Sequence, residues 1–384
     1  MPLEHFDIGD LDLDESSVSS HQQRLYQMFG VIANPFPSAS ETSGHRRMPT
    51  QADGQMDGLI AAFCRDNTSV CVAVTATQGV GKTNLLTAYE SALREKLGLR
   101  GFFVIRYMSD PEGSFDKMIR AVMEPLTEEF LRSTIIKCAE QRDLAWRTIV
   151  LTRDVRTAID RMIAAVENKD DERLESQLNH AHQWFLGLPV RKSHQDLLGV
   201  DFRLDTVESK TRAIRDLVSL GAHVGTLKGV FLLLDELEKH AGTLSRTGVV
   251  RYLLALRALI DALPRHLFLM LAMTSDALDR YSEMVPALRG RIAAKVALDP
   301  IDDEAAALRL CEFYLDEARA DGERVARAND WGGAGSRAIV SGSTAVGQFK
   351  ALATRSLSAG VRQRDYLNRL HMTADQVIAQ SVPE

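Results

Sequence analysis

The sequence predicts an α/β fold: a doubly wound parallel sheet with a large helical insertion and a C-terminal helical lid. Three observations predict it. Short apolar runs have the character of buried parallel strands, polar residues follow these runs directly, and segments with helical spacing separate them. The hydrophobic content of 45% and the charged content of 26% are ordinary for a globular protein, and 384 residues indicate two or three domains.

The first element is a strand, a glycine loop and a helix in direct succession. An apolar, β-branched run at 69–75 precedes a loop at 76–81, and a helical segment follows. The two glycines allow a tight bend that points backbone N–H groups at phosphate oxygens, and the helix N-terminus adds partial positive charge. The sequence therefore predicts a phosphate-binding loop whose nucleotide-binding residues are Gly79, Val80, Gly81, Lys82, Thr83 and Asn84.

Two side chains of this loop have predicted roles. Lys82 is expected to reach the β- and γ-phosphates of ATP, and the Thr83 hydroxyl is expected to ligate Mg²⁺. The usual pattern has glycine where this chain has Ala76, which is tolerated if that position does not need a positive φ. The alternative interpretation is a chance glycine-rich turn before a helix.

The second element is the unbroken apolar run 229–234, which ends in Asp235 and Glu236. Such a run predicts a central strand buried on both faces. Two carboxylates at its end are not core residues, because unpaired buried charge is costly, so we expect them at the ligand edge of the sheet. Asp235 would hold Mg²⁺ through water, and Glu236 would polarise the attacking water. Alternatively, the acids only begin a solvated helix.

The third element is the apolar strand 266–273, which follows an amphipathic segment at 249–263 and ends at Thr274. Strand, acid pair, helix and strand is the order of a doubly wound fold. We expect Thr274 to contact the γ-phosphate or the hydrolytic water, with Ser275 as the second choice. A helix N-cap is an equally good interpretation of Ser275.

The fourth element makes the chain resemble the AAA+ ATPases. A leucine–arginine segment at 285–293 leads through a short strand at 295–298 into Leu298-Asp-Pro-Ile-Asp-Asp-Glu-Ala305. AAA+ proteins have a similar segment before their helical lid, and the resemblance implies that Arg291 is an arginine finger that serves a neighbouring subunit. Arg289 is the alternative finger. A surface arginine paired with an acid is the simpler interpretation of Arg291.

The fifth element lies at 358–370, where the resemblance implies a lid arginine that folds back on the nucleotide. Arg364 is the preferred residue and Arg362 the second choice, although both could be solvated helix residues. The segment 26–37, with Asn-Pro-Phe-Pro at its end, resembles the opening of ATPases similar to the secretion ATPase ExeA and the origin-recognition initiators. Phage-defence ATPases of the BREX type are similar in this respect, and the family commonly packs this segment near adenine.

These elements divide the chain into five expected regions. They are an acidic N-terminus, disordered or ordered by a partner, at 1–25; the first part of the core at 26–111; a helical insertion at 112–227; the second part of the core at 228–300; and the lid at 301–384. Within these regions we expect a polar loop at 38–55, an apolar strand at 101–107 and a helix at 115–130. No convincing strand signal occurs in the insertion, which we expect to determine specificity.

Bulk properties limit the partners and the location. A net charge of −6 and a pI of about 6.0 argue against a protein coated in basic residues for nucleic acid. Two groups of arginines could still contact DNA or form solvated helix faces: Arg142, Arg147, Arg153, Arg156 and Arg161, and Arg355, Arg362, Arg364 and Arg369. The acidic N-terminus is unlike a signal peptide and no apolar run would span a bilayer, so we expect a cytoplasmic protein without membrane contact. Four scattered cysteines predict neither a disulfide framework nor a zinc site.

The sequence thus predicts an ATP- and Mg²⁺-dependent AAA+ ATPase that forms a homo-oligomer and remodels or loads a partner. We expect a protein partner, with DNA as a further candidate, in a bacterial DNA-processing or phage-defence system. The alternative is a nucleotide-dependent switch or scaffold with slow turnover. A small-molecule kinase is disfavoured, because an acid pair and two sensor elements exceed what a kinase needs.

Overall fold

The computed structural model describes residues 15–41, 43–109, 114–127, 129–142, 144–355 and 360–381. Contacts divide the chain into two compact units. The sheet unit comprises Pro49–Ala76 and Leu85–Leu298, and the lid unit comprises Met1–Met48, Thr77–Asn84 and Asp299–Glu384. The glycine loop at 76–81 thus falls almost entirely in the lid unit, although it continues directly from a strand of the sheet unit.

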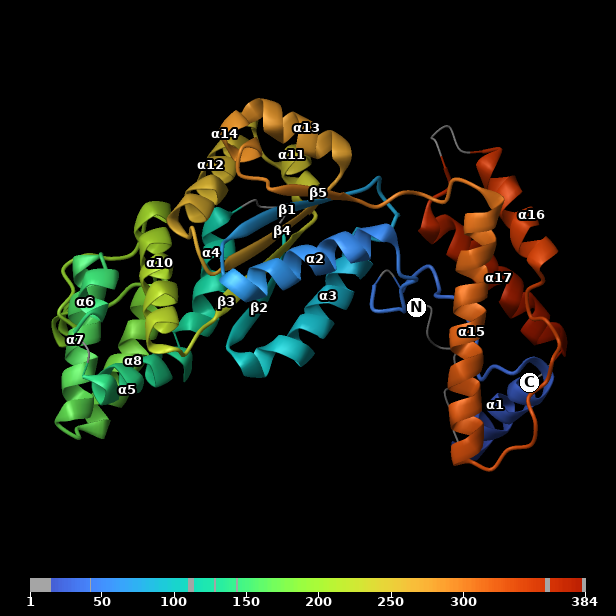
Figure 1. Cartoon of the computed structure of the whole chain (residues 1–384), viewed down its shortest axis with the longest axis horizontal. Helices are drawn as coiled ribbons and strands as arrows, with labels where there is room; N and C mark the ends of the chain where they lie inside the picture. Colours follow the sequence, from blue (N-terminus) through green and yellow to red (C-terminus); the bar gives the residue numbers. More distant parts are fainter. Residues whose placement is uncertain are drawn as a thin grey trace, which may run out of the picture. The chain divides into compact units, whose positions relative to one another are not determined.

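The sheet unit contains five parallel strands in the order β2-β3-β4-β1-β5 (Figure 1). Their bounds are β1 Val70–Thr75, β2 Phe102–Met108, β3 Gly229–Asp235, β4 Leu267–Met273 and β5 Ala294–Ala297. Each lies within a residue or two of the strand predicted from the apolar runs. β3 and β4 are buried along their whole length, as expected for central parallel strands. This is the parallel-sheet order of P-loop NTPases.

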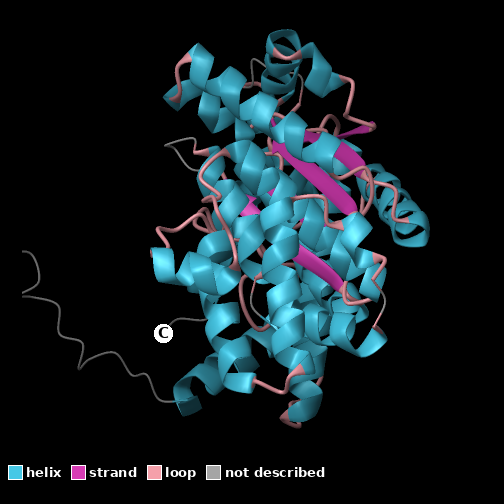
Figure 2. Ribbon diagram, turned by 90° about the vertical axis from the view of Figure 1, so that its left-hand side faces the viewer, coloured by secondary structure: helices cyan, strands magenta, loops and turns pink. Residues whose placement is uncertain are grey.

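Helices cover both faces of this sheet (Figure 2), which confirms the predicted doubly wound α/β class. On one face, α2 (Gln51–Asp66) inserts the Phe63 ring, with its centroid 5.2 Å from that of Phe231 and 5.5 Å from that of Phe268. Alternate strand residues such as Leu232 point the other way. They join the main core with α4 (Phe115–Met123), α10 (Val207–Val224) and α12 (Arg246–Ala262).

The segment predicted as a helical insertion is helical, and no strand occurs in its described residues. A single helix expected at 115–130 is broken around Pro125, which starts the 3₁₀ turn η3 (Glu124–Leu126). The insertion packs around the main core, in which Trp146 and Trp184 are both buried. Its other helices are α5 (Glu129–Gln141), α6 (Trp146–Ile149), α7 (Arg153–Glu167), α8 (Asp171–Phe185) and α9 (Lys192–Leu198).

The polar loop expected at 38–55 ends early, because α2 begins at Gln51. At the start of this helix, the Asp53 carboxylate accepts the Thr50 backbone N–H at 2.7 Å.

The remaining helices of the sheet unit follow individual strands. Helix α3 begins directly after the glycine loop and runs into the sheet unit. The bounds are α3 Lys82–Leu97, η2 Gly98–Arg100, η4 Leu237–Lys239, α11 His240–Thr243, α13 Ser275–Met284 and α14 Pro286–Arg289.

The lid unit is a helical cluster with its own apolar core, which includes Phe29 and Tyr366. Its helices are α1 (Glu15–Phe29), α15 (Glu304–Ala328), α16 (Gly342–Ala353) and α17 (Gln363–Ser381). The boundary expected at residue 25 falls inside α1, while residues 1–14 lie outside the described part of the chain. Across the described residues of both units, no helix is long and apolar enough to cross a membrane.

Candidate functional site

The glycine loop leaves the sheet at the carboxyl end of β1. The Ala76 N–H donates to the Met273 carbonyl oxygen at 3.4 Å, which extends the sheet by one bond. Gly79 and Gly81 then adopt φ values of +84° and +102°, a region that strains any residue with a side chain. Ala76 is not among the residues with positive φ, so alanine is accommodated there without strain. Lys82, which is 7% exposed, is the first residue of α3.

The start of α17 contacts this loop within the lid unit. The Arg364 backbone N–H donates to the Gly79 carbonyl oxygen at 3.1 Å, and the Arg362 side chain packs against Gly79. A Cβ at Gly81 would lie 3.3 Å from Gln363 Oε1. The structure therefore brings both candidate lid arginines to the loop. A narrow cavity of about 40 Å³ lies here.

A polar clamp, missed by the sequence analysis, attaches the segment before α2 to the loop. Asn84 is 3% exposed, and its Oδ1 accepts the Gly44 N–H at 3.0 Å. Its Nδ2 lies 3.3 Å from His45 Nδ1, and the Tyr314 hydroxyl oxygen lies 2.7 Å from the same ring nitrogen. Burial lowers the pKa of His45, which favours a neutral ring. Asn84 is thus held by the N-terminal segment, and Tyr314 extends the clamp to α15.

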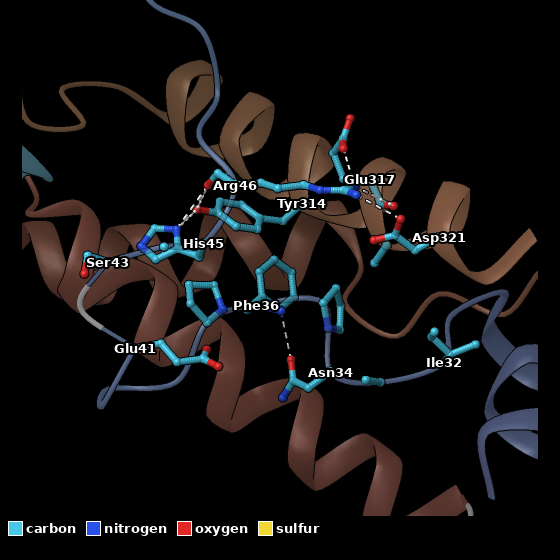
Figure 3. Close-up of a pocket in the computed structure, with 15 residues that line it drawn as sticks. Ile32, Asn34, Phe36, Glu41, Ser43, His45, Arg46, Tyr314, Glu317 and Asp321 are labelled. Atoms are coloured by element: carbon cyan, nitrogen blue, oxygen red, sulfur yellow. Dashed lines mark hydrogen bonds and ion pairs between the residues drawn. The ribbon is translucent and has the colours of Figure 1, made fainter. Parts of the chain in front are cut away.

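A larger cavity of about 550 Å³ adjoins this clamp, within the lid unit (Figure 3). Arg46 lies along its rim and forms ion pairs with Glu317 and Asp321 of α15. The larger cavity and the narrow one share Pro37, Glu41 and His45 as lining residues. Its volume is in the range of small-molecule sites, and its lining mixes aromatic rings with a few polar groups.

In the sheet unit, the carboxyl edge carries Asp235 at the end of β3. Its side chain is 0% exposed, and both carboxylate oxygens have donors. Oδ1 accepts the Glu236 backbone N–H at 2.9 Å, and Oδ2 accepts from Arg106 Nη2 at 2.9 Å. The sequence analysis did not identify Arg106. An arginine within the otherwise apolar strand 102–108 was the available signal, because charge in a buried strand requires a partner.

Glu236, the predicted base, adopts φ +58°, which is uncommon for a residue other than glycine. Such strained backbone often occurs at functional sites. Its carboxylate is partly exposed and forms an ion pair with Lys239 one turn later. The structure therefore places Glu236 beside Asp235 at the carboxyl edge, with its charge neutralised by a neighbour.

Three hydroxyl groups extend this edge. Thr274, which follows β4, is the N-cap of α13 and accepts the Ala277 N–H at 3.3 Å, so the cap is Thr274 rather than Ser275. Thr75 at the end of β1 and Ser109 after β2 are 1% and 4% exposed, and their hydroxyls have no hydrogen-bond partner within the described chain. Neither was predicted as a site residue. Buried hydroxyls without partners indicate room for a ligand or water.

Arg291 lies at the opposite edge of the sheet. The parallel register pairs Ala294 with Val72 near the start of β1, so Arg291 precedes the amino end of β5. Its guanidinium forms an ion pair with Asp261, as in the simpler of the two sequence interpretations. Arg289 is the last residue of α14. Within one sheet unit, Arg291 does not share an edge with the two carboxylates.

The donors present suit Mg²⁺. The buried carboxylate of Asp235 and the orphaned hydroxyls are hard oxygen ligands, which this cation prefers. Among the described residues, no group of three or more His, Cys, Asp or Glu side chains could hold a metal. Mg²⁺ is usually held by one or two carboxylates together with phosphate oxygens, so such a group is not needed.

Comparison with known proteins gives distant likenesses only. No protein-family model matches the chain, and no curated protein matches it. A structure of the Aeropyrum pernix ORC2 protein with ADPNP and ADP shares 13% identity, with a TM-score of 0.37 over 88% of this chain and 72% of that one. A Walker-type ATPase of Pyrococcus abyssi shares 14% identity, with a TM-score of 0.32 over 88% and 77%. Because these scores are low, the function is argued from this chain's own residues.

Proposed function

We propose that this chain is an AAA+ ATPase that binds and hydrolyses ATP with Mg²⁺. The observation that carries the proposal is the connection from β1 to α3, in which Gly79 and Gly81 adopt positive φ just before Lys82. Backbone N–H groups at a helix N-terminus form an anion site, and a lysine there adds a full positive charge. The orphaned hydroxyls and acids at the carboxyl edge of the sheet support the same chemistry.

The chain's residues have separate roles in this proposal. Lys82 binds the phosphates, and Thr83 and Asp235 hold Mg²⁺, which when bound neutralises charge on the β- and γ-phosphate oxygens. Glu236 accepts a proton from the attacking water once Lys239 releases its carboxylate. Thr274 accepts the Ala277 N–H, which leaves its own proton available to donate to the γ-phosphate or the water.

The proposed oligomer depends on a finger role for Arg291. Because Arg291 lies at the amino edge of its own sheet, a finger role requires the nucleotide of a second copy. The ion pair with Asp261 would hold the guanidinium until that copy docks. We therefore propose a homo-oligomer in which the phosphate loop of one subunit faces Arg291 of its neighbour.

A protein partner is favoured over direct DNA contact. Arginines of the insertion that could have formed a DNA footprint donate to acceptors in the chain: Arg147 to Asp160, Arg156 to Val150 and Leu151, and Arg161 to Asp196 and Leu197. The proposal is thus a motor that remodels or loads a protein in a DNA-processing or phage-defence system, with DNA as a candidate activator.

A second function, a nucleotide-dependent switch with slow turnover, is favoured by one observation. The predicted metal ligand Asp235 is paired with Arg106, and the predicted base Glu236 is paired with Lys239. The narrow cavity at the loop points the same way. In such a switch, a partner has to break the ion pairs of Asp235 and Glu236 before hydrolysis begins.

The test is steady-state ATP hydrolysis against protein concentration, with and without DNA, for wild type and Lys82→Ala. The matched control is Lys350→Ala, because that exposed lysine pairs with Glu304 in the lid unit. Turnover that rises faster than linearly with wild-type concentration and is lost only in Lys82→Ala supports the oligomeric motor. Tight ATP binding without turnover supports the switch, and absence of ATP binding contradicts both.

A further inference from the structure

We propose that Arg106 is an internal counter-ion for Asp235 that opposes Mg²⁺ binding and couples metal arrival to α3. The inference rests on the proposed nucleotide function, because it concerns the same carboxylate. Arg106 lies on β2, where the neighbouring register pair Met108–Asp235 shows that the two strands are aligned at their carboxyl ends. As Arg106 touches no reacting atom in this scheme, it is a positioning residue.

The burial of Asp235 explains why a counter-ion is needed. Its carboxylate is 0% exposed, and an isolated buried charge is strongly destabilising unless it is paired and hydrogen-bonded. Arg106 is itself only 14% exposed and donates to Asp235 Oδ2 at 2.9 Å. The pair is therefore shielded from solvent. An electrostatic interaction in such a buried position is stronger than one at the surface.

The other guanidinium nitrogen connects the pair to α3. Arg106 Nη1 donates to Thr87 Oγ1 at 2.6 Å and lies 3.3 Å from Glu90 Oε2. Both acceptors lie on the helix that begins at Lys82. The planar guanidinium can bridge separate acceptors in this way, whereas the single ammonium group of lysine cannot span them. A shift of Arg106 would thus be transmitted directly to the helix that follows the phosphate loop.

Mg²⁺ changes the balance of charge at this carboxylate. Without the cation, Arg106 neutralises Asp235; with it, a second positive charge arrives beside the guanidinium. If Arg106 stays, repulsion between the two cations lowers the affinity for Mg²⁺; if it moves, the loss of its ion pair with Asp235 lowers that affinity instead. Removal of Arg106 should therefore tighten Mg²⁺ binding and make stability more dependent on the cation.

In the first measurement, Mg²⁺ is titrated into full-length protein with mant-ADP, and the mant fluorescence is followed. In the second, thermal unfolding is recorded with and without Mg²⁺. For Arg106→Gln we expect apparent Mg²⁺ affinity to rise about tenfold, within the usual range of coupling between sites. We also expect a lower Tm than wild type without Mg²⁺ and a larger rise in Tm on adding it. Asp235→Asn combined with Arg106→Gln should abolish both effects, because the buried carboxylate and its counter-ion are then both absent.

The matched control is Arg147→Gln, which breaks the pair with Asp160 in the insertion and should leave Mg²⁺ affinity unchanged. If Arg106→Gln does not fold, Arg106→Lys replaces it, with a smaller shift in the same direction. An Arg106 variant with wild-type Mg²⁺ affinity overturns the counter-ion role while the proposed function stands. If wild type itself binds no mant-ADP at any Mg²⁺ concentration, the proposed function fails instead.

Discussion

Glu236 combines two unusual properties at the residue scale: a left-handed backbone and an ion pair with Lys239. The left-handed backbone aims the Glu236 side chain away from the path of a regular strand or helix, and the ion pair neutralises its carboxylate. A general base has to exchange such a partner for water before it can accept a proton. The strained residue and the proposed chemical role therefore coincide at one position.

Glu236→Gln tests this role directly. We expect mant-ATP binding to be retained, because the amide keeps the size of the side chain and the phosphate loop is unchanged. Turnover should fall by about 10²-fold or more, the usual contribution of a general base. Steady-state hydrolysis and mant-ATP titration measure the two quantities, with Glu238→Gln on the neighbouring turn as the control. Full turnover in Glu236→Gln would remove the general-base assignment.

His45 gives a prediction about pH. Burial lowers its pKa from the usual 6.5, so near and below that value the unfolded chain binds more protons than the folded one. The contribution of neutral His45 to stability is complete above about pH 6.5 and is lost as pH falls from there through the lower folded pKa. We expect His45→Asn to flatten this part of the wild-type profile.

Urea unfolding between about pH 5 and pH 8 measures this effect as the difference between wild type and His45→Asn. Subtraction is necessary because burial also lowers the pKa of His180 in the insertion. Glu41 and Arg47 act on His45 in opposite directions, so substituting either alone should shift the transition without abolishing it. Parallel profiles for wild type and His45→Asn would show that His45 does not titrate in this window.

At the element scale, α1 and α15 approach closely through a glycine. A Cβ at Gly322 of α15 would lie 2.5 Å from the Gly30 carbonyl oxygen at the end of α1. Gly30 itself has φ +74°, which ends α1. The backbone at Gly30 cannot move aside as a flexible side chain can. The contact therefore requires glycine at position 322, in the middle of a long helix.

Gly322→Ala should therefore lower the free energy of unfolding by roughly 1–3 kcal/mol, the usual effect of overpacking. The matched control is Gly347→Ala, inside α16, where nothing lies within 4 Å of the added methyl group. There the better helix propensity should raise stability by about 0.5–1 kcal/mol. Urea denaturation compares the two. Equal effects of the two substitutions would contradict a close packing of α1 on α15.

At the scale of the whole molecule, the residues with proposed catalytic roles lie at two opposite edges of the sheet. The acids and hydroxyls lie at the carboxyl edge, while Arg291 lies at the amino edge. A single sheet cannot bring both to one phosphate. The proposed finger role of Arg291 therefore needs an assembly, in which each subunit would supply one edge to each of two neighbours.

Mixing two inactive variants tests this arrangement. Lys82→Ala retains Arg291 but should not bind ATP, and Arg291→Ala retains the phosphate loop but lacks the finger. Each should be inactive alone, and their mixture should recover part of the wild-type hydrolysis rate at high protein concentration. The control is the same mixture with Arg289→Ala in place of Arg291→Ala, which should be active without its partner. No recovery would argue against a finger in trans.

Much of the fold was predictable because its signals are local. Continuous apolar runs predict buried parallel strands, and the polar residues that follow them predict the ligand edge. Gly79 and Gly81 predicted their own left-handed backbone, since few other residues adopt it. The helix expected at 115–130 was wrong in detail, because Pro125 divides it.

Local sequence is enough to identify the residues that could bind a phosphate and the positions of the strands, because backbone preference and hydrophobic periodicity act over a few residues. The contacts that these residues make depend on the folded chain. Arg106 and Asp235 are 129 positions apart, and His45 and Tyr314 are 269 apart. Such pairs leave no local pattern: they form because the sheet register and the lid core bring distant segments together, and buried charges and polar atoms then require partners.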